Sequence, residues 1–224
     1  MIIVVGDLHG DWGKLNALMS KKHPEIVLQC GDFGWWPQMD IKPVLYGMQK
    51  EWKLRGVKPG DSLVYWCDGN HENHWDLEKF TEPTEVYDGV NYMPRGTTLT
   101  LPDGRVVLFI GGADSVDKGY RTLGIDWYPE ELIRDVDLDR ALSHARVDIV
   151  ISHTCPAEFD IRGYSDDKIG DPSRVALSRV LERYKPALWY FGHWHVNKEG
   201  KFGDTRWTAL NYPGHGGRWW VELK

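Results

Sequence analysis

Residues 1–10 read MIIVVGDLHG, and two features of this stretch carry the interpretation of the chain. Residues 1–5 are an unbroken apolar run rich in β-branched side chains, which predicts a buried strand. A turn between Gly6 and Gly10 follows at once, and it carries the carboxylate of Asp7 and the imidazole of His9. Because ligands of open α/β sheets bind at the carboxyl ends of strands, this turn predicts a ligand site.

Four further apolar runs end in the same way, at a short polar turn with carboxylate, amide or imidazole side chains. They span residues 25–29, 62–67, 147–151 and 187–191, and we predict a strand for each. Strand ends of one parallel sheet lie along one edge, so we expect these side chains to converge there with Asp7 and His9. The side chains that follow the four runs are Asp32, Asn70, His153, His193 and His195.

Helical spacing of apolar residues alternates with these strands. It predicts helices over residues 11–21, with Asp11 as the N-cap, and over residues 129–145, which open with proline and two carboxylates. We therefore expect an α/β fold of two mixed sheets flanked by helices, in a single domain over residues 1–224. Further helices are predicted over residues 42–55, 72–80 and 172–184, extended segments over residues 85–94, 97–101 and 105–110, and a small antiparallel finish over residues 196–224.

Composition narrows the possible partners and location. The chain has 224 residues and a formal net charge of −6, and this acidic balance repels a nucleic-acid backbone, so we expect no stable nucleic-acid binding. Cys30, Cys67 and Cys155 are widely spaced, which is typical of reduced core thiols and of a cytoplasmic protein. No apolar segment reaches the roughly 18 residues that cross a bilayer, and no leader pattern opens the chain, so we expect no membrane partner.

Each of the seven side chains alone has an ordinary explanation, such as a turn or a helix cap. Together, oxygen and imidazole donors without a thiolate suit manganese, iron or zinc rather than a structural zinc site. Seven ligands exceed the needs of one ion, whereas two ions about 3.5 to 4 Å apart that share a carboxylate would use them and leave positions for water and substrate. Asp32 is the predicted shared ligand.

The order and spacing of these motifs resemble the calcineurin-like metallophosphoesterases, in particular a short bacterial or phage-encoded type. The motifs are Asp7-Leu8-His9, Gly31-Asp32, Gly69-Asn70-His71-Glu72, His153 and Gly192-His193-Trp194-His195, with Asn211 and Pro213-Gly214 beyond them. The resemblance implies a four-layer α/β-β-α sandwich and two divalent metal ions, with Mn²⁺ favoured and iron or zinc as alternatives. It also implies one ion held by Asp7, His9, Asp32 and His195, and a second held by Asp32, Asn70, His153 and His193.

The chemistry of such a metal pair is phosphate-ester hydrolysis. Two dications neutralise the phosphate and lower the pKa of a bridging water toward about 7, so that the resulting hydroxide attacks phosphorus. The leaving oxygen then needs a proton or a positive neighbour. His71, next to Asn70 but outside the ligand set, is the candidate catalytic residue; its alternative role is a hydrogen bond that only supports a ligand.

One family motif is incomplete in this chain. Many members continue Gly-Asp as Gly-Asp-x-x-Asp-Arg, whereas residues 33–36 read FGWW, so protein phosphatase activity is disfavoured. We expect a substitute cation in the loop over residues 111–131, where Lys118 and Arg121 are candidates for substrate binding. A tryptophan in the same loop could stack a base, which favours a nucleotide-like substrate; the alternative is a loop that merely covers the sheet. His215 is a further candidate for substrate contact.

Three other histidines need no function at this stage. We expect His74 to be an exposed helix residue one turn beyond His71. His23 and His144 are placed at helix ends, where a cation is mildly favourable.

The favoured function is hydrolysis of a small phosphodiester, such as a cyclic or simple nucleotide. A phosphomonoesterase with the same site is the first alternative, and a sugar-bridged nucleotide or a dinucleoside polyphosphate is a further substrate class. A non-enzymatic interaction scaffold on the same fold is an alternative of another kind; such a protein can lose ligands, whereas this chain retains all seven and His71. Nuclease activity is disfavoured by the acidic charge, and the oligomeric state stays open.

Overall fold

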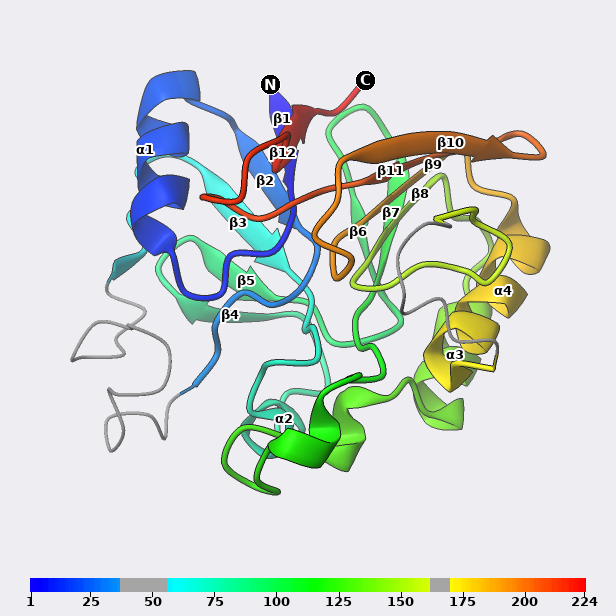
Figure 1. Cartoon of the computed structure of the whole chain (residues 1–224). Coiled ribbons are helices and arrows are strands. Elements are labelled where there is room, and N and C mark those ends of the chain that lie inside the picture. The colour runs from blue at the N-terminus through cyan, green and yellow to red at the C-terminus, as the bar shows by residue number, and fades with distance from the viewer. Residues whose placement is uncertain (37–55, 162–169) are drawn as a thin grey trace.

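The computed structural model describes residues 1–36, 56–161 and 170–224. Within these ranges the chain forms two six-stranded sheets that pack face to face, with helices on their outer faces (Figure 1). The helix predicted over residues 42–55 lies outside the described residues.

The first sheet has a parallel centre and antiparallel edges. It consists of β1 (Ile2–Val5), β2 (Ile26–Gln29), β3 (Leu63–Trp66), β4 (Thr84–Tyr87), β5 (Val90–Tyr92) and β12 (Trp220–Glu222). The strand order is β12-β1-β2-β3-β5-β4. Strands β1, β2, β3 and β5 run parallel, and the two edge strands run antiparallel to their neighbours.

The second sheet has the same plan. It consists of β6 (Thr97–Thr100), β7 (Val106–Ile110), β8 (Ile149–Ser152), β9 (Leu188–Phe191), β10 (Lys198–Phe202) and β11 (Thr205–Ala209). The order is β10-β11-β9-β8-β7-β6, in which the four inner strands are parallel and both edges are antiparallel.

Alternate side chains of the buried strands face different cores, which gives the molecule four layers. In β1, Ile3 belongs to the core on the outer face of the first sheet and Val4 to the core between the sheets. In β8, Val150 belongs to the core on the outer face of the second sheet and Ile151 to the core between the sheets. The predicted α/β-β-α sandwich is confirmed. The α-helices are α1 (Trp12–Lys22), which covers the first sheet, α2 (His74–Leu77), and α3 (Asp135–Leu142) and α4 (Pro172–Tyr184), which cover the second (Figure 1).

The helices α1 and α4 begin where the sequence signals predict. The Asp11 carboxylate accepts a hydrogen bond from the backbone N–H of Lys14 at the start of α1. Asp171 caps α4 by accepting from the N–H groups of Ser173 and Arg174, and Pro172 occupies the first turn.

The helix predicted over residues 72–80 is limited to the four residues of α2. Glu72 turns inward instead of starting the helix. Its Oε1 accepts a hydrogen bond from the N–H of Gly34 (2.9 Å) and its Oε2 from the N–H of Gly69 (2.5 Å), and Asn73 caps the helix that follows.

The helix predicted over residues 129–145 is broken in two. Pro129–Glu131 form a 3₁₀ turn, Leu132 is extended (φ −75°, ψ 145°), and α3 begins at Asp135. The break is explained by Glu131, whose carboxylate and carbonyl bind the segment before it: Oε1 accepts from the N–H of Ser115 (2.8 Å), and the carbonyl accepts from the N–H of Ala113 (3.0 Å).

Two predictions about strands also need correction. The extended segment predicted over residues 85–94 is a hairpin of β4 and β5, turned at Gly89 with φ +70°. The end of the chain is not a separate antiparallel unit: β10 and β11 do form an antiparallel pair, but β11 also pairs parallel with β9, and β12 joins the first sheet beside β1.

All three cysteines are free and buried, as predicted. Cys30 and Cys67 lie in the core between the sheets, and Cys155 lies in the core on the outer face of the second sheet. Within the described residues, no helix has the length and apolar character needed to cross a bilayer.

Candidate metal centre

The seven predicted ligands lie on five loops that meet at one end of the sandwich. The expectation that they come from the edge of a single sheet is wrong, because the two sheets contribute together. The parallel centres of both sheets end on the same side, so their loops face one another. Asp7 and His9 follow β1, Asp32 follows β2 and Asn70 follows β3 in the first sheet, while His153 follows β8 and His193 and His195 follow β9 in the second.

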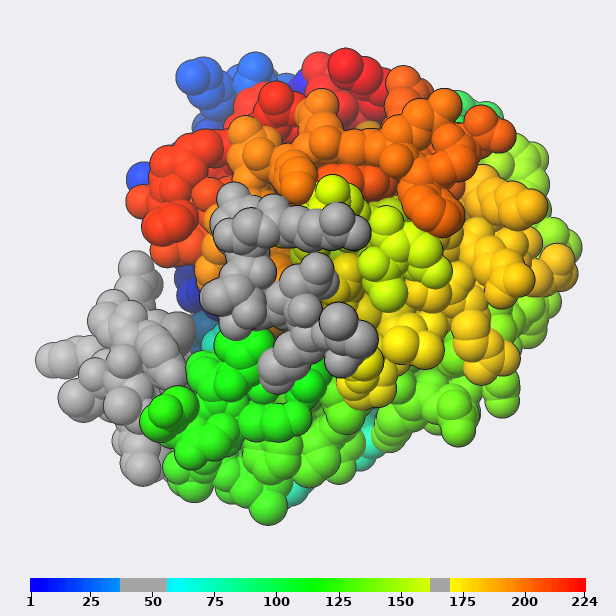
Figure 2. Space-filling view, turned by 45° about the vertical axis from the view of Figure 1, so that its right-hand side comes forward, coloured from blue at the N-terminus to red at the C-terminus, as the bar shows by residue number. Residues whose placement is uncertain are grey.

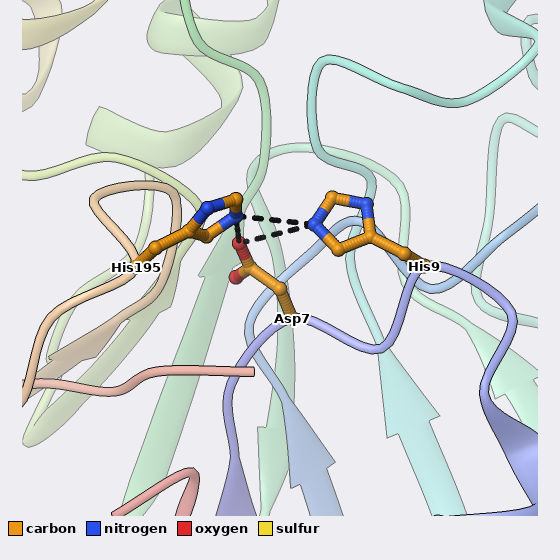
Figure 3. Close-up of side chains that lie close together, drawn as sticks. All are labelled: Asp7, His9 and His195. Atoms are coloured by element: carbon orange, nitrogen blue, oxygen red, sulfur yellow. Dashed lines mark hydrogen bonds and ion pairs between the residues drawn. The ribbon is translucent and has the colours of Figure 1, made fainter. Parts of the chain in front are cut away.

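Asp7, His9 and His195 form the first group of converging side chains (Figure 3). The Nε2 atom of His195 lies 3.0 Å from Oδ2 of Asp7 and 3.1 Å from Nε2 of His9. Nε2 of His9 is 3.8 Å from the same Asp7 oxygen. One metal ion could contact all three side chains.

Asn70, His153 and His193 form the second group. Oδ1 of Asn70 lies 2.9 Å from Nε2 of His153 and 3.0 Å from Nδ1 of His193. Asp32 lies between the two groups: its Oδ2 is 3.4 Å from Nε2 of His153 and 3.7 Å from Nδ1 of His9. This is the position that a shared ligand requires.

The backbone of the site is strained. Six non-glycine residues in the described part of the chain have positive φ, and two of them, His23 and Lys185, end helices. The other four are predicted ligands, and a left-handed backbone costs such residues energy that the surrounding structure must supply. They are His9 (φ 45°), Asp32 (51°), His193 (63°) and His195 (50°).

Asp7 and Asp32 carry buried negative charge. Burial raises the pKa of each carboxyl, but the neighbouring imidazoles outweigh it, so the pKa of Asp7 is lowered from 3.8 and that of Asp32 is lowered well below it. Within the described part of the chain, both carboxylates make their ion pairs with histidines alone. The pair therefore attracts cations.

His153 shows that the donor set fits a metal. Its Nδ1 donates a hydrogen bond to the carbonyl of Cys30 (2.9 Å), so a neutral ring presents a lone pair at Nε2. That lone pair faces oxygens of Asn70 and Asp32, which also accept. The metal-free ring therefore holds a second proton: burial lowers the pKa of His153, but Asp32 and Asp7 raise it to about 10. A divalent ion would replace this proton.

Gly69 and Gly192 let the two carboxylates lie against the loop backbone. A Cβ at Gly69 would overlap Oδ1 of Asp32, and a Cβ at Gly192 would overlap Oδ1 of Asp7. N–H groups of the same two loops bind these carboxylates: the N–H of His71 donates to Oδ1 of Asp32 (2.9 Å), and the N–H of His193 donates to Oδ1 of Asp7 (3.0 Å).

His71 lies beside the site and contacts the predicted cation. Its Nε2 is 3.9 Å from Oδ2 of Asp32 and accepts a hydrogen bond from Nη2 of Arg121 (2.8 Å). Burial lowers the pKa of His71 to about 4, so the ring is neutral near pH 7 and Arg121 carries the positive charge of the pair. Arg121 in turn forms an ion pair with Asp117 (2.7 Å).

The other two candidates for substrate contact, Lys118 and His215, are exposed. Lys118 pairs with Asp114 (2.7 Å). His215 is exposed and stacks on Tyr212, with ring centroids 5.1 Å apart. The Tyr212 ring also contacts those of His195 (4.6 Å) and His9 (5.8 Å). The segment over residues 111–131 and the segment after β9 border the same face of the molecule (Figure 2).

The structure adds a second polar cluster that the sequence interpretation missed. Oδ2 of Asp68 accepts from Nε (2.8 Å) and Nη2 (2.6 Å) of Arg95, and Nδ1 of His74 lies 3.4 Å from Nη2 of Arg95. All three are buried, so the expectation of an exposed His74 is wrong. The position of Asp68 after a strand was a usable signal, whereas nothing local marks Arg95. His23 ends α1, and His144 follows the end of α3, as predicted.

Comparisons with known proteins identify a sequence family and structures of similar fold. Residues 1–197 match the sequence family described as calcineurin-like phosphoesterase. Comparison with curated proteins finds no match. Among solved structures, the chain is similar to phosphopantetheinyl hydrolase (PptH) from Mycobacterium tuberculosis (TM-score 0.54, 13% identity, 99% of this chain and 95% of that one) and to the TT1561 protein of Thermus thermophilus (0.55, 13%, 94% and 88%). It is also similar to GAP50, described as the anchor in the inner membrane complex of Plasmodium (0.50, 12%, 94% and 70%).

Proposed function

The chain belongs to the calcineurin-like phosphoesterases, and from this membership we propose that it hydrolyses a small phosphodiester with two divalent metal ions. The observation that carries the proposal is the convergence of seven donor side chains from five loops, with Asp32 between the two groups. In this proposal Asp7, His9, Asp32 and His195 hold one ion, and Asp32, Asn70, His153 and His193 hold the other.

The bound ions would neutralise the phosphate and activate water for attack on phosphorus. The chain's own residues prepare the site for this role. The Cys30 carbonyl fixes the His153 ring so that Nε2 faces inward, and the loop N–H groups of His71 and His193 orient the two carboxylates.

We assign His71 to the leaving-group side of the substrate, with Arg121 behind it. The imidazole of His71 is neutral, and its Nε2 accepts a hydrogen bond from Arg121. The positive charge offered to the leaving oxygen therefore belongs to the guanidinium of Arg121. Arg121 would thus substitute for the arginine that the FGWW sequence over residues 33–36 lacks. Lys118 stays a weaker candidate, since Asp114 already pairs with it.

The Tyr212–His215 stack favours an aromatic or nucleotide-like substrate. Tyr212 contacts the rings of two proposed ligands, and the exposed His215 stacks on Tyr212. A base attached to a phosphate at the metals would meet this stack. The proposal has three further parts. The metal is Mn²⁺, the location is cytoplasmic, as the free thiols favour, and no nucleic acid is bound stably.

Metal-loaded protein assayed on bis-p-nitrophenyl phosphate and p-nitrophenyl phosphate tests the proposal. We expect Mn²⁺-dependent cleavage of the diester, lost in Asp32→Asn and retained in Asp204→Asn, whose carboxylate is fully exposed at a hairpin turn. Cleavage of the monoester alone would replace the diesterase by the phosphomonoesterase. Protein that binds metal and cleaves neither ester nor any nucleotide would favour the interaction scaffold.

A further inference from the structure

The amide of Asn70 has a fixed orientation, and its cause lies outside the proposed ligand set. Its Oδ1 faces His153 and His193, while its Nδ2 donates a hydrogen bond to Oγ of Ser115 (2.9 Å). An amide can turn over with almost no change in shape, and the turned form would present an NH₂ group to the histidines. An NH₂ group cannot bind a metal, and the acceptor at Ser115 stabilises the form that presents Oδ1 to the histidines.

Ser115 can act as that acceptor because its hydroxyl hydrogen is already donated in a hydrogen bond to Glu131. Oγ of Ser115 lies 2.5 Å from Oε2 of Glu131, and the N–H of Ser115 donates to Oε1 of the same carboxylate (2.8 Å). Nη1 of Arg121 also points at Oγ, at 3.3 Å. With two donors directed at it, the hydroxyl oxygen accepts from Asn70 and Arg121 and donates its one hydrogen to Glu131.

The chain of contacts is closed to water. The exposed fractions are 3% for Asn70 and 1% for both Ser115 and Glu131. A buried polar group without a partner is costly, so each member holds the next in one orientation. The inward turn of Glu131, which interrupts the helix predicted over residues 129–145, is what completes the chain of contacts.

We propose that Ser115 and Glu131 are positioning residues that keep the oxygen of Asn70 turned toward the metals. The inference rests on the proposed function. It gives the segment between β7 and α3 a defined role, because this segment would set the affinity of the ion held by Asn70, His153 and His193. The ion held by Asp7, His9 and His195 would not depend on it.

Titration of metal-free protein with Mn²⁺ tests the inference without an activity readout. We expect two ions per wild-type chain by calorimetry. Ser115→Ala should weaken one of the two sites by roughly 10- to 100-fold, the range typical when a group that orients a metal ligand is removed, and leave the other unchanged. At one equivalent of Mn²⁺, Ser115→Ala should therefore show the EPR signal of an isolated ion. Ser115→Thr keeps the hydroxyl, so it should restore binding of the second ion in the full titration.

Ser178→Ala is the matched control. Ser178 also donates to a glutamate, Oε2 of Glu158 at 2.6 Å, but it lies on α4, which covers the outer face of the second sheet. If both sites bind Mn²⁺ as tightly in Ser115→Ala as in the wild type, the inference alone is overturned. Wild-type protein that binds fewer than two ions would overturn the dinuclear function instead. If Ser115→Ala unfolds, Glu131→Gln decides, because its amide directs a donor at Ser115 and should weaken the same site.

Discussion

Among the non-glycine residues that the structure describes, left-handed backbone is concentrated at four of the proposed ligands, His9, Asp32, His193 and His195. Strain of this kind costs about 1 to 3 kcal/mol per residue and persists only where other contacts impose it. Here the N–H groups of Leu8 and His9 both donate to the Asp32 carbonyl, and those of His71 and His193 hold the carboxylates. The ligands are therefore arranged by hydrogen bonds of the chain itself, before any ion binds.

The contact between Gly192 and Asp7 gives a direct test at the level of one atom. We expect Gly192→Ala to lower the free energy of unfolding by about 1 to 3 kcal/mol, because the added Cβ overlaps Oδ1 of Asp7. Binding of the first ion should weaken as well. Chemical denaturation and metal titration measure the two effects. Gly119→Ala is the control, since a Cβ there meets no atom within 4 Å, and equal effects in the two variants would contradict the packing argument.

His74 makes stability depend on acid. Burial and Arg95 lower its pKa to about 3, so the folded chain keeps the ring neutral while the unfolded chain protonates it below about pH 6.5. Protons thus favour the unfolded state, and stability falls as the pH drops from 6.5 toward 3. We expect His74→Gln to reduce the loss between pH 6.5 and 4 by up to about 3 kcal/mol in denaturant titrations.

At the level of elements, local signals predicted most of the strands and the turns that carry the ligands. The runs before Asp7, Asp32 and His153 are apolar and β-branched, and each ends at a polar turn, so their structure follows from neighbours in sequence. The helix predictions were wrong where a side chain forms hydrogen bonds with residues distant in the sequence. Glu72 and Glu131 are favourable helix starters by sequence, but one binds two glycine N–H groups and the other binds Ser115.

The start of α4 is a prediction that local signals do carry. Asp171→Ala removes the acceptor for the N–H groups of Ser173 and Arg174, and we expect it to lower the free energy of unfolding by about 1 kcal/mol. Glu182→Ala, at an exposed position of the same helix, should change it by less than about 0.5 kcal/mol. Thermal unfolding of the two variants side by side provides the measurement.

At the level of the whole molecule, sheet assignment was beyond the sequence. Nothing in the local pattern indicates that β11 pairs parallel with β9, because β10 lies between them in the chain and pairs with β11 as a hairpin. Nor does it indicate that β12 lies beside β1, because these two strands are far apart along the chain. The convergence of the ligands could be predicted from strand ends, but their division between two facing sheets could not. Arg95 and the partners of Asn70 are likewise tertiary features without a local signature.

We propose that residues 1–224 form one folding unit, because the core between the sheets takes side chains from both. Val4 and Leu28 of the first sheet share it with Phe109 and Ile151 of the second. We expect one cooperative transition, with the same midpoint by far-UV circular dichroism and by tryptophan fluorescence. Two separate midpoints would show that the sheets unfold independently.

The buried thiols of the three cysteines can report on unfolding, because a reagent reaches them only when the chain opens. Burial raises the pKa of Cys30 and Cys67 well above 9.0, so neither offers a thiolate to an alkylating reagent while the sheets stay together. Cys155 sits instead under α4. Iodoacetamide labelling followed by peptide mass spectrometry should modify Cys30 and Cys67 at one common rate, that of global unfolding, and Cys155 at the same rate or sooner if α4 lifts first. Alkylation of Cys30 before Cys155 would mean that the two sheets separate before α4 detaches from the second sheet.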